Sequence, residues 1–373
     1  MIPATPDSRK LDGLDVLRGV AALLVLLHHG FGSISLEQNY NTVLAWGLWE
    51  RGSLGVNIFF VLSGFVIAWS NPRDGRSGRD VFIYVLRRFA RIYPLYWIAS
   101  ATLLPVMYFF SREGVNDMNP AKLAHDVLLI PHRINSILWG SWTLVFEMMF
   151  YLLFIPMLIN RRAGMVMWGT IAAVNIGLGI ARVEPENPFL AHLTSLYVLE
   201  FFAGLLVCLR MQRQPLTPPV AKAMVWNGAL LIAAFVVIET VTGFHHIPAN
   251  LHYAACATLL VAGLVSLPHP PQGHSRGFRF LQMMGTHAFS IYLFHIPFQK
   301  FVVKAALKVT GHEPGLPVVW GVLLAALAVS LTAGILIGKF VEQPILEWCK
   351  KRIAKLKAPR PAPLPAAPPG SPA

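Results

Sequence analysis

The chain has 373 residues, of which 55% are hydrophobic and 13% are charged, and its mean hydropathy is +0.55. A soluble domain carries about 25% charged residues, so this composition excludes an ordinary soluble enzyme and indicates an integral membrane protein. The formal net charge of +13 does not indicate a nucleic-acid partner, because no nucleic-acid-binding motif is present.

Apolar segments recur along the chain at close to the roughly 20 residues that a helix needs to cross a bilayer. They lack the alternation of membrane strands, so a barrel is not expected. We predict an all-α polytopic membrane protein with about ten transmembrane helices in one bundle. The predicted spans are residues 14–34, 54–70, 92–110, 136–159, 164–181, 190–209, 223–243, 249–267, 286–304 and 316–338.

An even number of spans puts both termini on one side of the membrane. Most of the 31 Lys and Arg residues lie in the terminal pieces and in alternate loops. Basic loops stay in the cytoplasm, which predicts a multi-pass protein of the cell inner membrane with both termini cytoplasmic. Residues 1–13 are the predicted cytoplasmic N-terminus, 14–348 the transmembrane domain, and 349–373 a basic, then Pro-rich tail that we expect to be disordered. The segment 341–344 is predicted to close the last helix.

The first span contains Arg18 and His29. Ionisable side chains are costly at membrane depth, so both are functional candidates. Eleven residues at about 100° each place them on the same helix face, about 16 Å apart along the axis. Each residue also has a structural explanation. Arg18 can be an anchor at the headgroups, where Asp15 can pair with it. His29 can be a structural residue that is hydrogen-bonded to another helix. As a catalytic group, a neutral imidazole accepts protons.

The next two motifs lie around the second span. Ser63 and Gly64 are small enough for close helix packing, which composition alone favours, although Ser63 is also a candidate substrate contact. Beyond the span, Arg87, Arg88 and Arg91 crowd one helical surface. They suit either the basic edge of a cytoplasmic loop or an anion clamp, because guanidinium groups bind phosphates in a bidentate manner.

Two later spans contain further ionisable side chains. Glu147 lies in strongly apolar sequence and needs a partner or a proton, and Tyr151 is one turn away on the same face. His295 lies mid-span, two residues before a proline, where structural and substrate-lining roles are equally favoured. Adjacent histidines such as His28 and His29 suit chelation poorly, so no metal site is predicted.

Together these segments resemble the acyltransferase-3 family of bacterial integral-membrane O-acyltransferases over residues 11–348. The motifs that carry the resemblance occur in order: LDGLDVLR at 11–18 running on to His29, FFVLSGF at 59–65, RRFARIYP at 87–94, SWTL at 141–144 with Glu147, Phe150 and Tyr151, and SIYLFH at 290–295. The chain is expected to be a stand-alone form without the extracytoplasmic esterase-like domain of some relatives.

The resemblance implies an enzyme that transfers an acyl group, most often acetyl, from cytosolic acyl-CoA to a hydroxyl of a cell-envelope or exported glycan. It assigns the catalytic role to His29, as a base or an acyl carrier, and places Arg88 and Arg91 near the phosphates of acyl-CoA. Arg18, Glu147 and Arg87 are expected to assist. Tyr151, His295 and Ser63 are expected to contact substrate, and no metal is expected.

Two alternatives remain open at this stage. One is a transporter with an intramembrane His, Glu and Arg relay, although the matched broken helices typical of transporters are not seen. The other keeps the acyltransferase but changes the acceptor to a lipid or a small metabolite.

Overall fold

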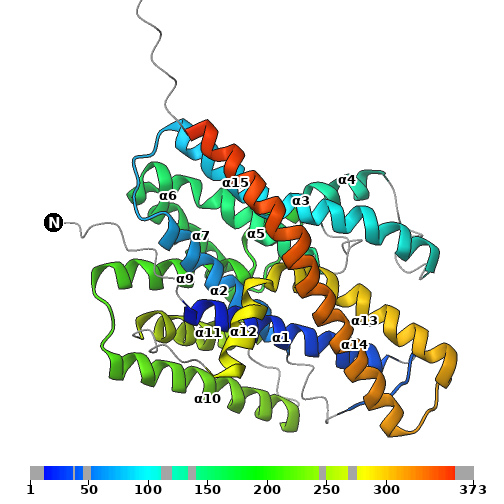
Figure 1. Cartoon of the computed structure of the whole chain (residues 1–373). Helices are drawn as coiled ribbons and strands as arrows, with labels where there is room; N and C mark the ends of the chain where they lie inside the picture. Colours follow the sequence, from blue (N-terminus) through cyan, green and yellow to red (C-terminus); the bar gives the residue numbers. More distant parts are fainter. Residues whose placement is uncertain are drawn as a thin grey trace, which may run out of the picture.

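A computed structural model gives the fold of the chain (Figure 1). It describes residues 12–36, 38–44, 52–110, 120–132, 140–242, 249–267 and 275–357. Within these ranges the regular elements are all helices and no strand occurs, which confirms the all-α prediction. The helices before the middle of the chain are α1 (Asp12–Ser35), α2 (Leu54–Ser70), α3 (Gly78–Phe110), α4 (Pro120–Leu128), α5 (Trp142–Leu153), α6 (Ile155–Ile159) and α7 (Arg161–Ala181).

The second half of the chain continues the same pattern. Its elements are α8 (Pro188–Leu193), α9 (Leu196–Arg213), α10 (Pro218–Thr242), α11 (Ala249–Ser266), α12 (Arg276–Thr286), α13 (Ala288–Thr310), α14 (Leu316–Ile337), the π-helical turn η2 (Gly338–Glu342) and α15 (Gln343–Lys357). Most predicted spans coincide with a single helix. The exceptions are 136–159, which from residue 142 onward falls on α5 and α6, 190–209, which falls on α8 and α9, and 286–304, which begins at the end of α12 and continues in α13.

Length and apolarity single out five helical stretches that can cross a membrane. They are Gly13–Ser35, Trp142–Ile159, Arg161–Ala181, Pro218–Thr242 and Leu316–Leu356, and α2 and Leu251–Ser266 are shorter apolar helices. These helices indicate that the protein is a membrane protein. The number of ten spans stays a prediction.

Two helical stretches extend far beyond the predicted spans. α3 begins at Gly78, well before the apolar part, because the preceding basic segment is also helical. The prediction that 341–344 closes the last helix is wrong: α14, η2 and α15 form one rod (orange to red in Figure 1). The widened π turn accommodates Pro344, which lies in the first turn of α15, where a missing N–H costs little.

The predicted tail begins inside this rod. Residues 349–357 are the second half of α15, so the expected disorder can apply only from residue 358, and those later residues lie outside the described part of the chain. α15 packs beside the start of α3, where Ile83, Ala90 and Ile353 form a small apolar cluster.

α1 is the central helix of the bundle and packs against α2, α11, α12, α13 and α14. Its contact with α12 is unusually close because Gly285 has no side chain: a Cβ there would lie 1.7 Å from the carbonyl oxygen of Asp15. A glycine also allows α2 to pack closely against α9, because a Cβ on Gly64 would lie 2.0 Å from the carbonyl oxygen of Phe201. These close crossings fix the helices that surround the candidate site.

Candidate functional site

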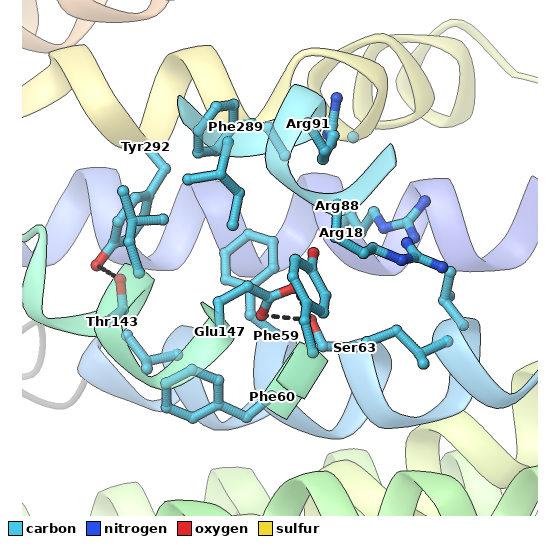
Figure 2. Close-up of a pocket in the computed structure, with 18 of the residues that line it drawn as sticks. Arg18, Phe59, Phe60, Ser63, Arg88, Arg91, Thr143, Glu147, Phe289 and Tyr292 are labelled. Carbon is cyan, nitrogen blue, oxygen red and sulfur yellow. Dashed lines mark hydrogen bonds between the residues drawn. The ribbon is translucent and has the colours of Figure 1, made fainter. Parts of the chain in front are cut away.

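A cavity of about 440 Å³ is enclosed by α1, α2, α3, α5, α12 and α13 (Figure 2). Its volume lies in the range of small-molecule binding sites, about 300–1,000 Å³. The structure brings together on its lining most of the side chains singled out from the sequence, namely Arg18, Ser63, Arg88, Arg91, Glu147 and Tyr151. Segments from both halves of the chain thus build one site.

One end of the cavity is cationic, and we call it the arginine end, formed by Arg18, Arg88 and Arg91. Arg18 pairs with Asp15 at 2.8 Å, which confirms the pairing that their spacing predicted. Arg88 donates a hydrogen bond to Ser70 Oγ at 3.1 Å. Figure 2 shows Arg18 and Arg88 side by side, with Arg91 nearby on α3.

Aromatic rings and a carboxylate hold these arginines in place. The guanidinium of Arg88 lies 5.3 Å from the ring centre of Tyr84 and 5.2 Å from that of Tyr151, within cation–π range. Arg91 forms an ion pair with Glu342 at 2.6 Å, and Ser290 Oγ donates to the same carboxylate. Glu342 is 1% exposed. It was missed because the segment 341–344 was interpreted only as the end of the last helix. A carboxylate so close to an apolar helix is the signal that points to it.

Glu147 lies between the two ends of the cavity. Ser63 Oγ donates to its two carboxylate oxygens at 2.9 and 3.1 Å, as Figure 2 shows. The phenol of Tyr151, one turn further along α5, is a second hydrogen-bonding partner. Both partners are neutral hydroxyls, and the cations Arg88 and Arg91 act on the carboxylate without contacting it. The predicted need of Glu147 for a partner is therefore met by hydroxyls rather than by an ion pair.

The opposite end, which we call the closed end, is formed by Gly140, Thr143 and Tyr292. Thr143 Oγ1 donates to the Tyr292 hydroxyl at 2.9 Å, and that hydroxyl donates to the carbonyl oxygen of Gly140 at 3.2 Å. Gly140 has φ +86°, which favours glycine and allows its carbonyl to approach the phenol. Tyr292 and Thr143 belong to recognised motifs, yet the sequence alone did not indicate that they meet.

His29 and His295 lie next to each other, outside the cavity lining. Their ring centres are 5.1 Å apart, and those of His28 and His29 are 4.8 Å apart. His295 is 1% exposed, and its Nδ1 lies 2.6 Å from the carbonyl oxygen of Tyr292. Because a carbonyl only accepts, Nδ1 carries the proton of a neutral ring, and Nε2 is left as a buried acceptor without a hydrogen-bond partner.

Gln299, one turn beyond His295 on α13, also has a buried acceptor atom without a hydrogen-bond partner. It is fully buried and donates through Nε2 to the carbonyl oxygen of Leu26 on α1 at 2.8 Å. Its Oε1 is a second buried acceptor without a hydrogen-bond partner. Buried polar atoms are rarely left unpaired, and such exceptions cluster at functional sites. Polar groups on α13 thus face α1 close to His29.

Arg87 is the one predicted arginine that the structure separates from the others. It lies exposed on α3 and does not line the cavity, because it is displaced by about 100° from Arg88 around the helix. Among the described residues, no group of three or more His, Cys, Asp or Glu side chains is arranged to hold a metal ion.

The cavity suits an elongated ligand with an anionic head and a mostly uncharged arm. Three guanidinium groups gather at the arginine end, whereas the closed end offers a phenol, a threonine hydroxyl and the ring of Phe59. Guanidinium groups are the preferred partners of phosphates. The single carboxylate between the ends, Glu147, faces whatever lies midway along such a ligand.

Comparison with known proteins identifies the family of this chain. The family model described as an acyltransferase domain matches residues 11–338. The chain belongs to the acyltransferase-3 family. The match covers all residues that line the cavity, and the resemblance drawn from the motifs is confirmed.

Curated relatives of this acyltransferase-3 protein carry consistent names. It is 28% identical to acyltransferase MdmB of Streptomyces mycarofaciens over 96% of this chain and 97% of the relative. It is 29% identical to the exopolysaccharide production protein ExoZ of Rhizobium meliloti, over 81% and 92% of the two chains. It is 23% identical to the peptidoglycan O-acetyltransferase OatA of Listeria monocytogenes, over 91% of this chain but 57% of OatA. No solved structure matches this chain significantly.

Proposed function

We propose that this protein transfers an acyl group, acetyl in the simplest case, from cytosolic acyl-CoA to a hydroxyl of a cell-envelope or exported glycan. The observation that carries the proposal is the cavity with three arginines at one end and hydroxyl groups at the other. The names of ExoZ and OatA, which refer to an exopolysaccharide and to peptidoglycan, support a glycan acceptor over a lipid or a small metabolite.

The phosphates of acyl-CoA bind at the arginine end in this proposal. Arg88 and Arg91 hold them through charge-assisted hydrogen bonds, and Arg18 completes the opening of the cavity. Arg87 lies outside the lining and serves at most as an outer phosphate contact. The arginine end then faces the cytoplasm of the inner membrane, in agreement with the basic loops and with cytoplasmic termini.

His29 is the proposed general base. It takes the proton of the acceptor hydroxyl as that oxygen attacks the thioester carbonyl, the carbon–sulfur bond breaks, and the departing thiolate of CoA takes the proton back. Such a base contributes about 10²–10⁴-fold to the rate. In the related route the acyl group passes through an acyl-histidine on His29. His295, whose ring lies 5.1 Å from that of His29, contributes an acceptor nitrogen for a second hydroxyl of the glycan, because the attacking hydroxyl gives its single proton to His29.

Glu147, Ser63 and Tyr151 are proposed to contact the acyl-pantetheine arm of the donor. Glu147 is held by Ser63 and Tyr151 inside the cavity, with no hydrogen bond to His29, which favours contact with substrate over orientation of the imidazole. Ser63 and Tyr151 complete the polar middle of the cavity.

The proposal is tested with membranes that contain the protein and radiolabelled acetyl-CoA. Label in the glycan fraction is compared for wild type, His29→Ala and the neighbouring control His28→Ala at equal abundance. We expect His29→Ala to lower transfer at least 100-fold and His28→Ala to retain most of it. Equal transfer by wild type and His29→Ala would remove His29 as the base, and a wild type that neither binds nor transfers from any acyl-CoA would overturn the donor.

A further inference from the structure

Tyr292 forms the barrier at the closed end of the cavity. Figure 2 shows its phenol bonded to Thr143 at the end opposite Arg18 and Arg88. Two hydrogen bonds fix the phenol, one from Thr143 at 2.9 Å and one to the Gly140 carbonyl at 3.2 Å. Its ring also packs edge-on against Phe59, with the ring centres 6.2 Å apart. The ring is therefore held by α2 and by the start of α5.

His295 lies next to this ring, and His29 lies next to His295. The ring centres of Tyr292 and His295 are 5.7 Å apart, and those of His295 and His29 are 5.1 Å apart. Tyr292 lines the cavity, whereas His295 and His29 do not. Tyr292 thus lines the cavity and also contacts His295, and its own carbonyl fixes the orientation of His295.

We propose that Tyr292 is the residue that determines the length of the acyl group. This inference rests on the proposed function, because it uses the placement of the donor phosphates at the arginine end. An extended arm that starts at Arg88 and Arg91 ends at the opposite end of the cavity, so its acyl group stops against the Tyr292 ring. A short acyl group brings the thioester carbonyl close to the Tyr292 ring, against which His295 packs. Each additional methylene pushes that carbonyl back toward Glu147 and away from that ring.

The matched variants are Tyr292→Ala, which removes the ring, and Tyr292→Phe, which keeps the ring and removes only the hydroxyl. Affinities for acetyl-, butyryl- and hexanoyl-CoA are measured with the full chain in lipid nanodiscs, so that no acceptor is required. The wild type is expected to prefer acetyl-CoA. In Tyr292→Ala each methylene that enters the new space should strengthen binding about fourfold relative to wild type, so that butyryl-CoA gains more than tenfold. Tyr292→Phe should keep the wild-type order.

The measured quantity is the ratio between chain lengths, which a purely structural role would not change. If Tyr292→Ala folds poorly, Tyr292→Leu provides a smaller enlargement and should shift the same ratio in the same direction. An unchanged preference for acetyl-CoA in Tyr292→Ala, or an equal loss of affinity for all three donors, would overturn the assignment. A wild type that binds none of the three would instead refute acyl-CoA as the donor, which is a failure of the proposed function and not of this inference.

Discussion

Glu147 and Glu342 are both carboxylates inside the helix bundle, but their partners differ. Glu342 contacts the guanidinium of Arg91 at 2.6 Å and also accepts from Ser290. Glu147 is bonded by the neutral hydroxyls of Ser63 and Tyr151, and it lines the cavity. Glu342 does not line the cavity; it holds an arginine that does.

This difference separates a carboxylate that positions a binding residue from one that is available to substrate. A contact ion pair in a buried setting uses the charge of Glu342 to fix Arg91. The partners of Glu147 are hydroxyls and not cations, so its carboxyl group is not tied up in an ion pair and can make a further hydrogen bond with a ligand. Substitution of each carboxylate by its amide should therefore affect different steps.

The largest effect is expected for Glu147→Gln. The amide keeps the shape but replaces one carboxyl oxygen with an NH2 group, so a hydrogen bond from substrate to that oxygen is lost and transfer should fall about 100-fold at unchanged donor affinity. Glu200→Gln is the matched control, because Glu200 is also buried and pairs with an amide, Asn57, at 2.6 Å, away from the cavity. Transfer of radiolabelled acetyl groups measures both. Equal losses in the two variants would place Glu147 in a structural role.

A smaller effect on a different step is expected for Glu342→Gln. Arg91 loses its ion pair while Ser290 can still bond the amide, so Arg91 is less well held. We expect the acetyl-CoA concentration at half-maximal rate to rise about fivefold with little change in the maximal rate. Because the Arg91 side chain is 39% exposed, the loss in stability should be only about 1 kcal/mol. If the maximal rate fell while the acetyl-CoA concentration at half-maximal rate stayed the same, the role of Glu342 in positioning Arg91 would be contradicted.

The smallest effect on activity is expected for Glu239→Gln. Glu239 on α10 lies 2.7 Å from His252 on α11 and accepts from Tyr253 at 3.1 Å, and none of the three lines the cavity. The variant should lower the free energy of unfolding by about 1–3 kcal/mol through its unpaired partners. Thermal unfolding in detergent should show the loss, whereas transfer per folded molecule should remain that of wild type. A selective loss of transfer would show that this pair belongs to the active site.

Much of this site could be predicted, because ionisable side chains are rare in apolar helices and therefore stand out in the sequence. Arg18, Arg88, Arg91 and Glu147 stand out as ionisable side chains in or beside apolar helices, and all four line the cavity. The partners could not be predicted, because they come from distant segments: Arg91 and Glu342 are 251 residues apart, and Asn57 and Glu200 are 143 apart. A single sequence gives the face of each helix but not which faces meet.

In the fold, too, some features could be predicted from the sequence and others could not. Apolar length located the helical segments, and the residues of α2 were predicted in full. The π turn before Pro344 was not predicted, because proline after an apolar run usually marks an end, and only packing reveals that the rod continues. His29 was singled out by its spacing to Arg18, and its catalytic role stays a prediction. The position of the Tyr292 ring could not be predicted, because it depends on a contact across 149 residues with Thr143.

The most direct test of the account compares the binding of acetyl-CoA and of acetyl-pantetheine, which lacks the phosphates, to wild type and Arg88→Ala in nanodiscs, with exposed Arg87→Ala as the control. Wild type and Arg87→Ala should bind acetyl-CoA at least tenfold more tightly than acetyl-pantetheine, and Arg88→Ala should remove most of that difference. An equal loss of affinity for both ligands in Arg88→Ala, or a loss as large in Arg87→Ala, would contradict the placement of the donor phosphates at the arginine end.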